Sequence, residues 1–188
     1  MEFLKNFNWV DVLLLALLVR IVYISVKTGF VIEFMKTAAI FLAVLASFHF
    51  YTRLAAFTSH FTSIPKDLLE PAALALIGIF VVVVCKFMRD GFLLVFTVQT
   101  VSVVDCWGAG IVSLVRFFLT GSLLMFFFLA TGYPYLQRMT LDSFARKYVL
   151  FAAPDTYRKV TRGFIAKVIP GQKVNPAVGE VLDGAGKQ

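Results

Sequence analysis

Residues 107–131 read WGAGIVSLVRFFLTGSLLMFFFLAT, and this stretch decides the class of the protein. Its only charged residue is Arg116, and aliphatic and phenylalanine side chains fill most of the other positions. A helix crosses the hydrocarbon core of a bilayer when about 20 consecutive residues are predominantly apolar. The stretch therefore predicts a transmembrane helix.

Three earlier stretches are also long and apolar enough to cross a bilayer. They are residues 7–26, 30–51 and 71–88. The connection Lys27-Thr28-Gly29 between the first two is so short that these spans should form an antiparallel hairpin. Pro71 is expected in the first turn of the third helix, where its missing N–H does no harm. The four spans predict an all-α, polytopic membrane bundle over residues 1–132.

The composition of the whole chain agrees with a membrane protein. Of its 188 residues 60% are hydrophobic, 21 are phenylalanine and only 15% are charged, and the mean hydropathy is +0.85. A soluble domain of this length could not bury so much apolar surface. Soluble enzymes, disordered proteins and secreted disulfide scaffolds are therefore excluded. Cys85 and Cys106 could meet on one side of the membrane, but free thiols are the expectation.

The stretches outside the spans are more polar. Residues 89–105 are expected to be an interfacial segment that joins the third and fourth spans. Residues 133–170 repeat apolar side chains at helical spacing, which predicts amphipathic surface helices. Gly, Pro and polar residues dominate residues 171–188, for which disorder is expected.

The predicted surface helices carry a basic face. Its residues are Arg158, Lys159, Arg162 and Lys167. A helix that is apolar on one side and cationic on the other can lie on a membrane, with its charges toward anionic lipid head groups. The alternative is that these helices pack on the bundle's own loops. The net charge of +7 is assigned to lipid rather than nucleic acid, because no nucleic-acid-binding motif is present.

Among the ionisable residues inside the predicted spans, five stand out. They are Asp11, Arg20, Glu33, Lys36 and Arg116. Such residues are costly in a bilayer and often functional. Counting about 1.5 Å per residue puts the three cations in one layer around a single acid, Glu33. Three interpretations stay open: a structural clasp that fixes helix register, a proton or anion pathway, and snorkelling toward the interfaces.

The fourth span also carries a stripe of small residues. Asp105 and Arg116 share one face of this helix, and Ala109 and Ser113 lie on that face between them. Small residues at every fourth position let another helix approach closely. This spacing predicts close helix packing along the stripe.

No arrangement of residues indicates catalysis, a metal or a cofactor. His49 and His60 fit no metal-binding pattern, and the sequence contains no nucleophile elbow or Gly-rich phosphate loop. His49 is expected to be an interfacial residue beside Tyr51. The chain is therefore expected not to be an enzyme and to need no cofactor.

Four short motifs resemble those of the colicin V production protein (CvpA) family of bacterial inner-membrane proteins. Residues 8–11 (NWVD) are similar to the family's W-x-D start, and residues 27–33 (KTGFVIE) resemble its R-G-F-V-R-E turn. Residues 46–51 (ASFHFY) are similar to a stretch that closes the second span in some members. Asp105 and Arg116 match the spacing of its D-R-x-x-G-x-x-x-G-x-x-R-G pattern. The departures are Thr28, Cys106, Ala109, Ser113 and Phe117, and the resemblance covers residues 8–165.

The resemblance implies a four-span protein that supports production or export of a peptide toxin, or upkeep of the cell envelope. It implies no catalytic residue. The matched residues expected to matter most are Asp11, Gly29, Glu33, Asp105 and Arg116.

Two functions from different classes remain at this point. The leading hypothesis is a non-enzymatic membrane protein that acts through protein partners or self-association. The alternative is a small proton or anion transporter that uses the Arg/Glu layer, and a membrane-bound enzyme is a weaker third. A cavity that reaches Arg116 would favour transport, whereas a packed core with an apolar outer groove would favour a scaffold.

Overall fold

The computed structural model describes residues 8–61, 65–95, 103–165 and 174–186, and within these ranges the chain forms helices and no strands. Four helices are long and apolar enough to cross a membrane. They are α1 (Trp9–Thr28), α2 (Phe30–Ser59), α3 (Lys66–Val95) and α4 (Val103–Ala130). The prediction of an all-α bundle with four candidate spans is confirmed.

The helices extend beyond the predicted spans. Both α2 and α3 contain 30 residues, or about 45 Å at 1.5 Å per residue, whereas the hydrocarbon core is about 30 Å thick. Hydropathy marks only the part of a helix that lipid covers, so it misses the polar turns at Arg53 and Glu70. For the same reason Pro71 lies inside α3 rather than in its first turn.

Helices occupy both ends of residues 89–105, the stretch predicted to be an interfacial segment. The helix α3 continues through Arg89 and Asp90 to Val95, and α4 already begins at Val103. Charged residues do not end a helix whose backbone hydrogen bonds remain within it, so Arg89 and Asp90 do not interrupt α3. Residues 96–102 lie outside the described residues.

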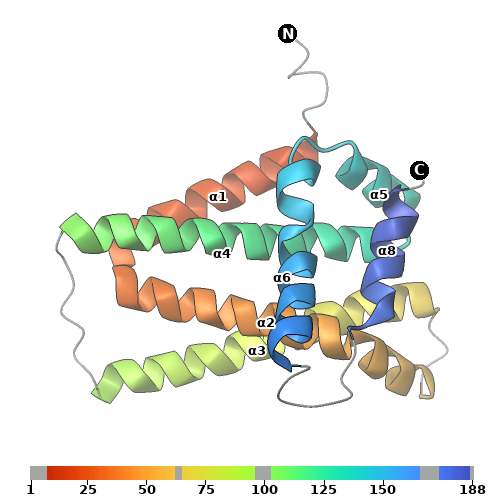
Figure 1. Cartoon of the computed structure of the whole chain (residues 1–188), viewed down its shortest axis with the longest axis horizontal. Helices are drawn as coiled ribbons and strands as arrows, with labels where there is room; N and C mark the ends of the chain where they lie inside the picture. Colours follow the sequence, from red (N-terminus) through yellow and green to blue (C-terminus); the bar gives the residue numbers. More distant parts are fainter. Residues whose placement is uncertain (1–7, 62–64, 96–102, 166–173, 187–188) are drawn as a thin grey trace, which may run out of the picture.

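The four long helices lie side by side in the order α1, α4, α2 and α3 (Figure 1). The hydroxyl of Ser25 in α1 donates to the carbonyl of Ala109 in α4 at 2.7 Å. On the other side of α4, the hydroxyl of Thr37 in α2 contacts the carbonyl of Val112 at 3.4 Å. The first two helices therefore do not pair as the predicted hairpin, because α4 separates them.

Gly29 makes the turn that lets α1 and α2 diverge. It is the only residue between the two helices, it is buried, and its φ and ψ are 80° and 165°. Residues that carry a side chain are strained in this backbone conformation, whereas glycine adopts it without strain. The requirement for glycine here is thus conformational.

Shorter helices cover the end of the bundle at which α4 finishes. They are α5 (Pro134–Leu141), the π-helical turn η1 (Arg146–Leu150), α6 (Ala152–Val160), the π-helical turn η2 (Thr161–Ile165) and α8 (Pro176–Gly186). We call them the C-terminal cap. In Figure 1, α6 runs across α4 and α2.

The cap is fastened to α4 through a buried serine. The hydroxyl of Ser122 donates to the carbonyl of Leu150 at 2.6 Å and accepts from the amide of Ala153 at 2.9 Å. Ala153 and Tyr157 are completely buried. The apolar face of α6 therefore packs on the long helices themselves, not on the loops of the bundle.

The prediction of disorder over residues 171–188 is wrong for residues 176–186, which form α8. Val178 and Leu182 lie one helical turn apart and are both buried. The side-chain amide of Asn175 donates to the carbonyl of Phe48 at 3.0 Å and so anchors the start of the helix to α2. The composition of this segment did not predict these contacts, because two apolar residues are enough to hold a short helix against a surface that the rest of the fold provides. Residues 171–173 and 187–188 lie outside the described residues.

Candidate functional site

A completely buried carboxylate, Glu33, lies at the centre of a cluster of charges near the Gly29 turn. Glu33 and Lys36 come from the first two turns of α2, and Arg116 comes from the middle of α4. Arg116 Nη1 lies 2.6 Å from Glu33 Oε1, and Lys36 Nζ lies 3.2 Å from Glu33 Oε2. The Arg116 contact is a close ion pair rather than a well-aligned hydrogen bond.

Two threonines connect this cluster to the neighbouring helices. The hydroxyl of Thr28, at the end of α1, lies 3.4 Å from Glu33 Oε2 and 3.3 Å from Lys36 Nζ. Thr37 donates to the carbonyl of Glu33 at 2.9 Å and also contacts α4. Glu33 is thus the point at which α1, α2 and α4 are held together.

The geometry of this cluster is that of a clasp. In a medium of low dielectric constant, the attraction between a carboxylate and a cation on each of its oxygens is stronger than in an exposed pair, and it offsets the cost of removing these charges from water. Removing either partner of a buried ion pair strongly destabilises the fold, because the remaining charge is left without compensation. The cluster can fix the register of α2 against α4. With two cations and one carboxylate, it carries an excess of one positive charge.

Arg20 does not belong to the cluster, so the predicted layer of three cations around Glu33 is wrong for this residue. The buried face of α1 carries Leu14, Ile21 and Ser25, and Arg20 lies on the exposed side. None of the ion pairs found within the described ranges includes Arg20. The prediction considered only depth along the helix, whereas the rotation of Arg20 about the axis of α1 is set by packing against α4.

The small residues of α4 lie where the helices approach most closely. Ala109 and Ser113 are both completely buried, and Ala109 offers its carbonyl to Ser25. A Cβ atom at Gly108 would lie 2.9 Å from the ring of Phe30, so α2 also approaches closely here. Asp105 lies apart from this contact in the first turn of α4, where a carboxylate stabilises the N-terminal end of a helix.

Asp11 forms a second carboxylate site at the opposite end of α1. It is 5% exposed, and its Oδ2 accepts from the amide of Asn8 at 3.1 Å as part of a capping box. Its carboxylate also accepts from the hydroxyl of Ser143 at 2.5 Å and from the amides of Phe144 and Ala145 at 3.2 and 3.0 Å. Asp11 therefore joins the beginning of the chain to the segment that leads into η1.

The residues of both carboxylate sites lie almost entirely within a family match. The family model for colicin V production protein matches residues 10–154. The chain belongs to the colicin V production protein family. No curated protein and no solved structure matches it. The match includes Asp11, Glu33, Arg116 and Ser143, whereas most of α6 and all of α8 follow it.

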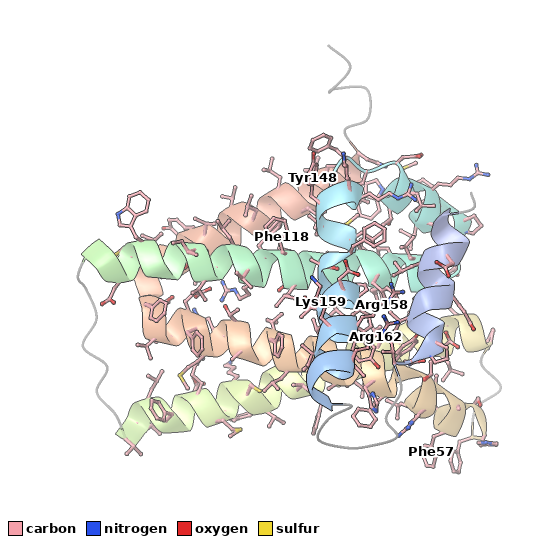
Figure 2. The ribbon with its side chains drawn as sticks, in the orientation of Figure 1. Phe57, Phe118, Tyr148, Arg158, Lys159 and Arg162 are labelled. Carbon is pink, nitrogen blue, oxygen red and sulfur yellow. The ribbon has the colours of Figure 1, made fainter. Side chains whose placement is uncertain are left out.

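The predicted basic face lies beyond the matched region of this colicin V production family member. Arg158, Lys159 and Arg162 lie together where α6 crosses the long helices (Figure 2). Lys159 and Arg162 are exposed and Arg158 is half-buried. Lys167 lies outside the described residues.

Sequence reasoning missed the polar contacts that hold the cap. Tyr157 is completely buried, and its hydroxyl lies 3.3 Å from His49 Nδ1 and accepts from the amide of Asn175 at 3.1 Å. Each of these residues is unremarkable in sequence, and only the fold brings them together. Cys85 and Cys106 are both free, as expected.

Replacing Glu33 with Gln should destabilise the protein strongly, because Arg116 and Lys36 would remain at the site without a counter-charge. Removing one partner of a buried pair costs about 3–5 kcal/mol, and the partial exposure of Lys36 places the expected loss near the lower figure. Unfolding in detergent, followed by circular dichroism, measures it. Asp90→Asn is the matched control, since its half-exposed pair with Arg89 should contribute less than about 1 kcal/mol. An unchanged melting temperature for Glu33→Gln would contradict the clasp.

Replacing Asp11 with Asn should loosen the segment before η1 while leaving the bundle folded. An amide group has one acceptor oxygen in place of two, and its NH2 would face donors. Hydrogen bonds to a charged group contribute about 1.5–3 kcal/mol, so local opening should rise at least about tenfold. Limited trypsin digestion at Arg138, Arg146 and Lys147 measures this opening. Asp142→Asn, at an exposed position in the same segment, should leave the rate unchanged; equal rates in both variants would refute the role of Asp11.

Proposed function

We propose that this protein is a non-enzymatic scaffold of the bacterial inner membrane. It supports the production or export of a colicin V-like toxin, or homeostasis of the cell envelope, through protein partners or self-association. The observation that carries the proposal is that the Glu33 cluster is buried while apolar surface is exposed beside it. Glu33 is fully occupied by two cations, while the surface that remains open to partners is apolar.

Two outer grooves offer apolar surface to a partner. One lies between α2, α3 and α4 and has a volume of about 380 Å³; the other lies between α1 and α4 and has about 420 Å³. Neither set of lining residues includes Glu33 or Arg116. Apolar grooves beside a closed ion cluster favour a scaffold over a pathway through the cluster.

The C-terminal cap is proposed to lie at the membrane surface. Large exposed apolar side chains on α4 extend from Trp107 to Phe118 and no further, and α6 contacts α4 just beyond, at Ser122. On α3 such residues run from Leu68 to Val95, a rise of about 40 Å that is more than enough to cross a hydrocarbon core of about 30 Å. At the edge of this apolar belt, the basic face of α6 and η2 can bind anionic lipid head groups.

Filling the groove between α1 and α4 should abolish the supporting function without unfolding the protein. Gly110 lines this groove, and a Cβ atom there would meet no atom within 4 Å. In a toxin-producing host that lacks this gene, wild-type protein should restore toxin release or envelope integrity, and Gly110→Leu should not. The measurements are toxin activity in the medium and leakage of a periplasmic enzyme.

Gly91→Leu is the matched control for this experiment. Gly91 lies on the exposed side of α3, and a Cβ atom there also meets no atom within 4 Å. This variant should restore function fully. A Gly110→Leu variant as active as wild type would exclude the α1/α4 groove as a partner site, and a host unaffected by loss of the gene would refute the proposed role.

A second candidate function is proton or anion transport, which the excess positive charge of the Glu33 cluster favours. Flux measurements on the purified protein in proteoliposomes distinguish the transport function from the scaffold function. The scaffold proposal expects no proton or chloride flux above that of empty liposomes. Flux that is lost in an Arg116→Ala variant, with the variant shown to be folded and inserted, would instead assign transport to the cluster.

A further inference from the structure

The groove between α2, α3 and α4 is lined almost entirely by apolar side chains. Ile40 and Ala43 form its floor on α2, α3 lines it from Leu74 to Val83, and α4 lines it from Thr120 to Phe127. The α3 wall rises about 14 Å. On α4, Ser122 points to α6, so Thr120 and Leu124 line a face turned away from the cap. An apolar groove that follows α3 over this length suits an extended acyl chain.

One end of this groove adjoins the charge cluster. Lys36 lies one helical turn before Ile40, and Arg116 lies one turn before Thr120. Arg89 approaches from α3, within electrostatic range of Lys36. Cations from all three walls of the groove therefore lie at the same end, the end nearest Gly29.

These charges do not balance. Glu33 neutralises only one of its two cations, and Arg89 is neutralised by Asp90 at 2.6 Å. One positive charge remains at the level of Lys36, whose side chain is 19% exposed and so accessible. An uncompensated charge at this depth is costly, and a group with a single negative charge would offset it.

We propose that this groove binds one anionic phospholipid, with its phosphate against Lys36 and one acyl chain between α2, α3 and α4. Basic pockets between transmembrane helices are known to bind anionic lipid head groups. The site differs from the basic face of the cap in both position and chemistry, since it holds the chain as well as the head group. It does not depend on the proposed scaffold function.

Native mass spectrometry of the full-length chain in detergent tests this site. The probes are dioleoylphosphatidylglycerol and dioleoylphosphatidylcholine, which differ in net charge but share their acyl chains. One basic residue near a lipid surface contributes about 1 kcal/mol, so the phosphatidylglycerol should bind about fivefold more tightly. Lys36→Gln should remove this preference while leaving the Glu33–Arg116 pair. Lys159→Gln makes the same change of charge on the cap and should preserve the preference.

A second pair of variants tests the acyl-chain part of the site. Ala75→Phe fills the groove and should weaken the binding of both lipids, whereas Leu76→Phe, at an exposed position outside the groove, should not. A photoactivatable group on the acyl chain of phosphatidylglycerol should label residues 74–83 or 120–127. These two measurements stand even if Lys36→Gln fails to fold.

Several outcomes would overturn the proposal. Equal affinity of the wild type for the two lipids would remove the head-group site, as would equal effects of Lys36→Gln and Lys159→Gln. Unchanged binding by Ala75→Phe, with label confined to other helices, would remove the acyl-chain site. Displacement of label by a second copy of the chain, but not by unlabelled phosphatidylglycerol, would make the groove a protein interface.

Discussion

The contact of Glu33 with Arg116 and Lys36 is the constraint on which the arrangement of the bundle depends. Glu33 lies four residues after Gly29, in the first turn of α2, so its carboxylate is fixed close to the point where α1 and α2 diverge. Arg116 can reach it only if α4 lies against α2 with Gly108 beside Phe30 and Val112 beside Thr37. Burying the carboxylate therefore specifies both the neighbour of α2 and the register of that contact, which apolar side chains alone would leave open to slippage.

Asp11 imposes a comparable constraint at the other end of α1. Because its carboxylate accepts from Ser143, Phe144 and Ala145, the chain that leaves α5 must return to the start of α1 before it can form η1. From there Ser122 and Tyr157 direct α6 across α4 and α2. The two carboxylates thus have different structural roles. Glu33 holds the long helices in register, and Asp11 fixes where the C-terminal cap begins.

Sequence patterns predicted the parts of this structure that depend on local chemistry. Hydropathy located all four long helices, and counting residues along them correctly placed Lys36 and Arg116 beside Glu33. The positions that failed depend on contacts between distant segments. Arg20 was misplaced because the rotation of α1 is set by Ser25 and Leu14 packing on α4. The predicted hairpin of α1 and α2 was wrong, because a short turn makes two helices run in opposite directions but does not make them contact each other along their length. Neither α8 nor the Asn175 contact has a signal in composition.

The two groups of basic residues differ in their position relative to the apolar belt, and this explains their different pairing. Arg116 lies between Val115 and Phe118 on α4, inside the belt that exposes apolar side chains to lipid, so it needs a counter-charge within the protein. Lys159 and Arg162 lie where α6 crosses α4 beyond Phe118, and their exposed charges can be neutralised by water or lipid head groups. Lys36 falls between these cases: it shares the carboxylate of Glu33 with Arg116 and remains partly exposed beside an apolar groove. That intermediate position is the physical reason to expect a lipid phosphate there rather than at Arg116.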